Sequence, residues 1–455
     1  MPEVSLKRVL GIWSAAAIVV GTVIGSGILL VPKTMVLNVG SPKMTFFVWV
    51  FGGLLSLAGA LTYAELAAAM PEAGGEYVYL REAYGPFWGF LYGWTQMWVA
   101  KSGSIATLAT GFFLYLANFR PELEGVMYSI PLPLGANGAP LEIRYGQIMA
   151  MAVILLLGLI NYFGVKVGGD VQVVVTIVKV GLILAVIVIG LGAGIGRVSN
   201  YATSVPAAGG ITGFFAALVA ALWAYDGWNN VSMVSSEIRD PQRNLPRALI
   251  AGTLLVMILY VLTNVAYFYV LPAAQVAASD RVPAEMMRRI FGPGAADVVA
   301  IGAMISIFAA LNGSILSGSR VPYAMARDRR FFRAVERVHP THRTPSVSIL
   351  LLTGWSAILV LSGQYDQLFN YVIFASWILY GMATASVIVL RYKRPDLPRP
   401  YRALGYPVVP VLFVLVALAL LTSTLLKSPR ESLMGLGLIF AGVPFYHYWK
   451  RADLR

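Results

Sequence analysis

The chain has 455 residues, of which 58% are hydrophobic and only 12% are charged. Soluble domains carry about 25% charged residues, so this composition excludes an ordinary soluble protein and predicts one membrane domain over residues 1–455. The net charge of +13 comes from basic residues scattered along the chain, which argues against a nucleic-acid partner. There is no cysteine, and the three histidines lie in loops or near the C-terminus, so we expect neither a metal site nor a cofactor.

Twelve apolar segments are long enough to cross a bilayer as helices. A hydrocarbon core about 30 Å thick needs about 20 helical residues, and the segments lack the polar–apolar alternation of barrel strands. We therefore predict an all-α integral membrane protein with twelve transmembrane helices. The predicted spans are residues 10–37, 44–70, 86–117, 145–163, 168–193, 211–237, 247–272, 294–322, 346–362, 367–391, 404–426 and 433–449.

The distribution of basic residues predicts the orientation of these spans. If both termini are cytoplasmic, the loops on that side hold 22 of the 34 lysines and arginines, and the opposite loops hold 10. This bias follows the positive-inside rule. It predicts a multi-pass protein of the cell membrane, surrounded by lipid, with cytoplasmic N- and C-termini. Glu65, near the cytoplasmic end of the second span, is expected to pair with a loop arginine.

The first and sixth spans are longer than a bilayer requires, and both contain residues that weaken a helix. Three glycines lie within residues 21–27, and residues 225–230 interrupt the middle of the sixth span. Each interior glycine costs about 1 kcal/mol relative to alanine, so both helices are predicted to break. The N-terminus of a half-helix favours a carboxylate, and free carbonyls suit an ammonium group. Paired breaks five spans apart are typical of a transporter site at the membrane midplane.

Helix packing is the alternative explanation for the glycines. Gly21 and Gly25 form a small-xxx-small motif, which is common where membrane helices cross closely. Asp226 favours a functional site, because a carboxylate at mid-membrane depth costs at least about 3 kcal/mol and usually has a role in function.

Three motifs, in order and correctly spaced, resemble the amino acid–polyamine–organocation superfamily and, more narrowly, its L-type amino-acid transporter branch. They are Gly-Thr-Val-Ile-Gly-Ser-Gly-Ile at 21–28, Tyr-Ala-Glu-Leu at 63–66 with Pro-Glu-Ala-Gly-Gly-Glu-Tyr at 71–77, and Trp-Ala-Tyr-Asp-Gly-Trp-Asn at 223–229, followed by Glu237 and Asp-Pro-Gln-Arg-Asn-Leu-Pro at 240–246. The resemblance implies a leucine-transporter-type fold: two inverted five-helix repeats, residues 10–193 and 211–391, plus two helices within 404–449. Without cysteine, the chain resembles a microbial member that has no disulfide-linked heavy chain.

The resemblance also implies which residues contact the substrate. The amides of Ser26 and Gly27 are expected to bind its carboxylate, and the carbonyls of Val23, Trp223 and Asp226 its ammonium group, with Trp223 acting as a gate. The whole predicted substrate site is Thr22, Val23, Ile24, Gly25, Ser26, Gly27, Trp223, Ala224, Tyr225 and Asp226.

Three polar residues inside the spans are further candidates. Lys179 resembles the residue that occupies a sodium site of sodium-coupled relatives, and it is expected to bridge the unwound part of the first span; a purely structural lysine is the alternative. Lys101 and Asn312 are candidates for lining the cavity, with pairing between helices as the alternative.

These features predict a transporter rather than an enzyme. The resemblance implies a sodium-independent exchanger of neutral L-amino acids that works by alternating access. Proton-coupled symport, with Lys179 as the titrating group, is the alternative, and an amino-acid sensor or channel is a remote one. No catalytic set of side chains lies within the spans.

Overall fold

The computed structural model describes residues 5–131, 140–362 and 365–452. Helices make up most of this part of the chain, which confirms the prediction of a helical membrane protein. Among these described residues, seven helices are long and apolar enough to cross a membrane. There are eight such spans if the bent pair α1 (Ile12–Val23) and α2 (Gly27–Val39) is counted as one. The structure also contains a two-stranded antiparallel sheet that was not predicted, β1 (Val126–Ile130) and β2 (Leu141–Arg144).

Each predicted span coincides with one helix or with consecutive helices. In the first half these are α3 (Pro42–Ala69), α5 (Pro86–Thr95), α6 (Lys101–Leu116), α7 (Tyr145–Tyr162) and α8 (Val165–Gly192), and the short helix α4 (Glu76–Tyr84) lies between two predicted spans. The second half contains α9 (Gly210–Ala224), α10 (Asn230–Met233), α11 (Pro241–Val270), α12 (Ala273–Ala278), α13 (Val282–Phe291), α14 (Ala295–Gly318), α15 (Arg320–Arg327), α16 (Ser346–Ser362), α17 (Tyr365–Lys393), α18 (Val408–Lys427), α19 (Pro429–Phe440) and α20 (Val443–Ala452).

Besides the first and sixth spans, which were predicted to break, three predicted spans are not single α-helices. The eighth is interrupted at Ser319, between α14 and α15. The third consists of α5 and α6 joined by a π-helical turn, Gln96–Ala100. The last is divided into α19 and α20 at Ala441 and Gly442. A Cβ on Gly442 would lie 2.8 Å from the indole of Trp94, so this interruption lets the chain pass closely over α5.

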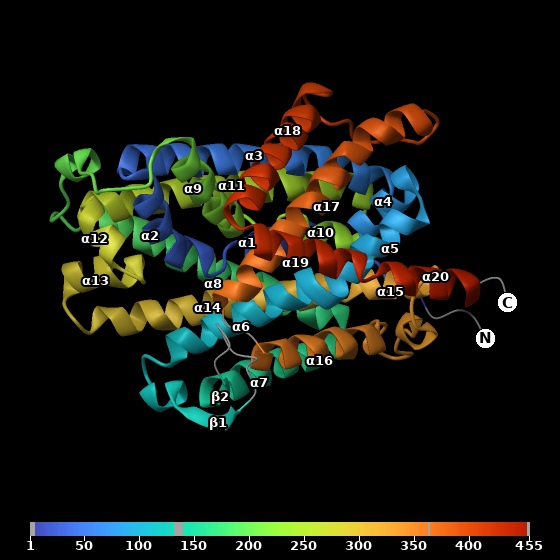
Figure 1. The fold of residues 1–455 in the computed structure, drawn as a ribbon, viewed down its shortest axis with the longest axis horizontal. Helices are drawn as coiled ribbons and strands as arrows, with labels where there is room; N and C mark the ends of the chain where they lie inside the picture. Colours follow the sequence, from blue (N-terminus) through green and yellow to red (C-terminus); the bar gives the residue numbers. More distant parts are fainter. Residues whose placement is uncertain (1–4, 132–139, 363–364, 453–455) are drawn as a thin grey trace.

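The long helices lie side by side in layers (Figure 1). α3 and α11 pack together on one side, α7 and α16 on the other, and α6 packs on α14 between them. In lipid, a helix satisfies its own backbone hydrogen bonds, so close packing of apolar faces is possible without buried unpaired amides. α15 and α20 lie at one end of the molecule, and α12 and α13 lie at the opposite end (Figure 1).

The chain segment before α1 is tied to the segment after α10. Leu10 and Ile238 form an isolated parallel bridge. Its hydrogen bonds run from the amides of Val9 and Leu10 to the Glu237 carbonyl, both at 3.0 Å, and from the Arg239 amide to the Leu10 carbonyl at 2.8 Å. The start of α1 is therefore joined to the end of the sixth predicted span.

Two buried carboxylates, Glu237 and Glu65, form three ion pairs with arginines. Arg320 and Glu237 are both fully buried, with guanidinium–carboxylate distances of 2.6 and 3.0 Å. Glu65 is paired with Arg391 at 2.6 Å and with Arg399 at 3.3 Å. One loop arginine was predicted as its partner, and Glu65 has two arginine partners. Breaking a buried pair leaves one charge uncompensated, and this makes these contacts important for stability.

Candidate substrate site

The two predicted breaks are present, and they lie against each other. α1 ends at Val23 and α2 begins at Gly27, with a bend of 40° between them. α9 ends at Ala224, and a turn leads from there to α10. A Cβ on Gly27 would lie 2.5 Å from the Cα of Ala224, so only glycine permits this approach of the two broken helices.

The first break is shorter than predicted, and Gly21 lies outside it. Gly21 is part of α1, where a Cβ would overlap the side chains of Gln172 and Thr176 on α8. This glycine therefore serves helix packing, which was the alternative explanation, whereas Gly27 lies at the break itself.

A small polar cavity of about 30 Å³ lies between the two breaks. One buried water needs about 10–15 Å³ of such space, so an amino acid fits only if the surrounding helices move apart. The residues that line the cavity come from both breaks and from α6, α10 and α14: Thr22, Val23, Gly25, Ser26, Gly27, Lys101, Ser104, Leu108, Trp223, Asp226, Gly227, Asn230 and Ser314.

The start of α2 presents hydrogen-bond donors to this cavity. The first N–H groups of any helix have no partner within the helix, and here these belong to the cavity-lining residues Ser26 and Gly27. The Ser26 hydroxyl is buried and has no hydrogen-bond partner among the described residues. A buried polar group without a partner is costly. This end of the cavity therefore suits a ligand carboxylate.

The ends of α1 and α9 carry carbonyl groups near this cavity. Tyr260 of α11 directs its hydroxyl to the carbonyls of Val23, at 2.9 Å, and Ala224, at 3.0 Å. The Trp223 carbonyl accepts a hydrogen bond from the Asp226 amide at 3.0 Å. Each carbonyl oxygen has two lone pairs, so those facing the cavity can accept a further bond from an ammonium group.

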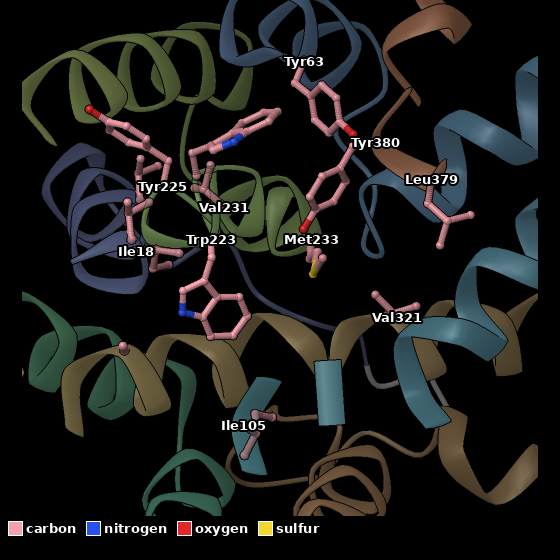
Figure 2. Packing of buried hydrophobic residues seen from close by; sticks show 14 of the residues in the cluster. Ile18, Tyr63, Ile105, Trp223, Tyr225, Val231, Met233, Val321, Leu379 and Tyr380 are labelled. Atoms are coloured by element: carbon pink, nitrogen blue, oxygen red, sulfur yellow. The ribbon is translucent and has the colours of Figure 1, made fainter. Parts of the chain in front are cut away.

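The side chains of the second break point in different directions. Figure 2 shows the Trp223 ring directed toward the ribbon of α14, whereas Tyr225 points away from it. The Tyr225 hydroxyl donates to the Trp49 carbonyl at 3.0 Å, in the packed core. Asp226 accepts a hydrogen bond from the Tyr380 hydroxyl at 2.8 Å. Three of the ten predicted substrate-site residues, Ile24, Ala224 and Tyr225, are not among the described residues that line the cavity, and they contribute to the fold of the breaks. The other seven line it: Thr22, Val23, Gly25, Ser26, Gly27, Trp223 and Asp226.

Thr22 connects the two breaks directly. Its hydroxyl lies 2.6 Å from the Ile18 carbonyl of its own helix and 2.8 Å from the Gly227 carbonyl. Gly227 has a φ of 107°, a region that favours glycine. The turn after α9 is thus held against the last turn of α1.

Lys179 lies behind the first break. Its ammonium group donates to the carbonyl of Gly21, at 2.7 Å, and to that of Ile24. Ser306 of α14 donates to the same Ile24 carbonyl at 3.1 Å. Lys179 is 1% exposed, so these carbonyls replace its water shell. The lysine therefore joins α8 to α1 and to the first break.

Lys101 lies at the edge of the cavity. It follows the π-helical turn between α5 and α6, and such turns are frequent at functional sites. Its ammonium group donates to the Asn230 side-chain carbonyl at 2.6 Å. Asn312, in contrast, is not among the described residues that line the cavity. It donates to the side chain of Gln172 at 2.8 Å and accepts from Asn161 at 2.9 Å, which joins three helices.

Tyr260 is the principal contributor to this site that the sequence did not indicate. A tyrosine in an apolar span is commonly a core residue, and no local sequence pattern around Tyr260 indicates that it contacts the breaks. Its hydroxyl acquires one only because α11 packs against both breaks.

Paired broken helices with a polar cavity between them are typical of a membrane transporter. The chain belongs to the amino acid permease family, which it matches over residues 10–439. It is 33% identical to the serine/threonine exchanger SteT of Bacillus subtilis (strain 168), over 98% of each chain.

Animal proteins are similar over nearly the same length. The chain is 32% identical to the b(0,+)-type amino acid transporter 1 of Mus musculus, over 97% of this chain and 88% of that protein. It is 30% identical to the human cystine/glutamate transporter, over 98% and 86%. These similarities confirm the resemblance to the superfamily and its L-type branch, and they confirm a transporter rather than an enzyme.

Proposed function

We propose that this protein exchanges neutral L-amino acids across the cell membrane, independently of sodium and by alternating access. The observation that supports the proposal is that both kinds of main-chain group come from residues that line one cavity. Ser26 and Gly27, at the start of α2, supply N–H groups, and Val23 and Trp223, near the ends of α1 and α9, supply carbonyls. A substrate that satisfies both sets of groups carries a carboxylate and an ammonium group on the same carbon, as an α-amino acid does.

Alternating access accounts for the size of the cavity. At about 30 Å³ it is closed around less space than an amino acid needs, so substrate entry requires movement of the helices that carry the breaks. Glycine residues form much of the wall beside Trp223, which favours a compact neutral side chain. The proposed substrate site is the set predicted from the sequence, Thr22 to Gly27 and Trp223 to Asp226.

Sodium independence is supported by the position of Lys179. Its ammonium group already contacts the carbonyls of Gly21 and Ile24, which are the kind of ligands that a bound cation would use. The same geometry supports proton-coupled symport as the second candidate. Among the described residues, the hydrogen bonds of the Lys179 ammonium group go to carbonyls. A neutral amine can also donate to carbonyls, so Lys179 could lose its proton and keep these contacts.

The topology is part of the proposal. Twelve transmembrane helices, two five-helix repeats within residues 10–193 and 211–391, and two C-terminal helices agree with the positions of both breaks in the chain. The end of the molecule that carries α15 and α20 would face the cytoplasm, as the loop charges predict.

Reconstituted vesicles test this function directly. Uptake of radiolabelled serine should require unlabelled amino acid inside and should be the same in sodium and in potassium buffer. Competition by a panel of neutral, acidic and basic amino acids should show a preference for neutral ones. Uptake into empty vesicles that follows a pH gradient would replace exchange by proton symport, and dependence on sodium would contradict both.

Lys179→Met should abolish uptake, because it removes the ammonium group that holds the break while keeping the length of the side chain. Lys166→Met is the matched control, since Lys166 lies on the same helix α8 but is exposed. Unchanged uptake by Lys179→Met would mean that this lysine has only a packing role.

A further inference from the structure

A second and larger cavity, of about 450 Å³, lies among α2, α8, α11, α13 and α14. None of the described residues that line it also lines the substrate cavity. Most of the lining is aliphatic or aromatic. Three of its four polar residues turn their polar atoms to backbone carbonyls: Lys179 and Ser306 toward Ile24, and Thr263 toward Leu259. The surface of this cavity is therefore apolar.

The cavity leads from the lipid-facing surface to the back of the first break. Phe291 and Val298, on its wall, are 64% and 68% exposed, whereas Lys179 and Ala303 are 1% and 3% exposed. The neighbouring surface of α8 and α14 is also apolar, and Val188 is exposed there. In a family of membrane transporters such a surface faces hydrocarbon. The mouth therefore opens to the bilayer interior.

We propose that an acyl chain of a membrane phospholipid binds in this cavity. The cavity is continuous with the lipid-facing surface, and its apolar walls can satisfy a hydrocarbon chain but not a zwitterion or an inorganic ion. Its inner end is formed by the Lys179 stem, Ser306 and Ala303. Because Lys179 and Ser306 both bind the Ile24 carbonyl, the chain packs directly behind the first break.

Photocrosslinking in vesicles tests the proposal. The probe is a phosphatidylcholine with a diazirine near the methyl end of one chain, and mass spectrometry locates the attached residues. Attachment is expected at buried wall residues such as Ile183 and Ala303, which a chain on the outer surface cannot reach. Attachment only to surface residues such as Val188 would overturn the proposal.

A glycine pair provides a matched control. Gly302 lines the cavity, and a Cβ there would make only ordinary contacts, at 3.5 and 3.9 Å from Leu182. Gly302→Phe should fill the cavity and abolish attachment at Ile183. Gly181→Phe adds the same ring to an exposed position of α8 with open space around it, and attachment should persist. Equal attachment in both variants would also overturn the proposal.

The occupant can be distinguished from water by single-cysteine labelling, which is unambiguous because the chain contains no cysteine. In Ala303→Cys, a membrane-soluble alkyl maleimide should react and a charged methanethiosulfonate should not. Reaction with the charged reagent would show a water-filled cavity and refute lipid binding. These readouts do not use transport, so they stand or fall separately from the proposed exchange activity.

Discussion

The Tyr260 hydroxyl connects the ends of both broken helices, and we predict that Tyr260→Phe impairs transport. Tyr260 is fully buried on α11, with its oxygen 2.9 Å from the Val23 carbonyl and 3.0 Å from the Ala224 carbonyl. The substitution removes one oxygen atom and leaves the ring in place. It therefore changes the positioning of the two carbonyl ends without opening a large cavity.

The expected size of the effect follows from the hydrogen-bond count. A phenol donates one proton, so one buried hydrogen bond is lost, at a net cost of about 1–2 kcal/mol. A cost of this size changes an equilibrium constant by about 5- to 30-fold. If the conformation that binds substrate needs both carbonyls in place, kcat/KM for exchange should fall by about that factor.

The assay is serine exchange in preloaded vesicles, together with thermal unfolding of the purified protein. Tyr84→Phe is the control, because its hydroxyl also donates to a carbonyl, that of Met382 at 3.0 Å, far from the breaks. Both variants should be slightly less stable than the wild type, and only Tyr260→Phe should transport poorly. Wild-type kcat/KM in Tyr260→Phe would refute the positioning role.

Gly27→Ala should abolish exchange, because its Cβ would overlap the second broken helix, whereas Gly25→Ala should retain most of it, since the nearest contact of its Cβ is 3.5 Å; equal uptake by the two variants would contradict this. Glu237→Gln should lower the free energy of unfolding by about 3–5 kcal/mol, because it leaves the buried charge of Arg320 uncompensated. The double variant Glu237→Gln with Arg320→Gln should lose less of this free energy than the two single variants added together, which thermal melts measure. Burial raises the pKa of Glu76, in α4 outside the membrane-crossing helices, above the ordinary 4.5. The ionised form of Glu76 therefore destabilises the native state, so the free energy of unfolding should fall as pH rises from about 4.5 through the raised pKa of Glu76. Glu76→Gln should reduce this fall, and identical pH profiles of the thermal melts would disprove the prediction.

The positions of the helices were largely predictable because hydropathy and helix length are local properties of the chain. The spans at 44–70 and 145–163, for example, match α3 and α7 closely. The β1–β2 sheet was missed because β1 (Val126–Ile130) is almost wholly exposed and lacks the alternation of a half-buried strand, and because β2 (Leu141–Arg144) alternates over only four residues.

The parts of the site that depend on local backbone properties were predictable from the sequence. The parts that depend on contacts between residues far apart in the chain were not. Glycine content indicated both breaks, but it placed the first one too early, because the cost of glycine in α1 is offset by the packing of Gly21 against Gln172. Asn312 is joined to residues about 140 positions earlier in the chain, and no local pattern reveals such contacts. Tyr260 was missed for the same reason.

The bridge between Leu10 and Ile238 has a mechanical consequence. Three main-chain hydrogen bonds join the segment before α1 to the segment after α10, although more than 200 residues separate them along the chain. While the bridge is intact, α1 and α10 therefore move together, and neither can move without the other. Any motion that opens the site on the side of this bridge must either move α1 and α10 together or first break the bridge. In the second case, the amides of Val9, Leu10 and Arg239 would exchange with deuterium at the rate of the transport cycle.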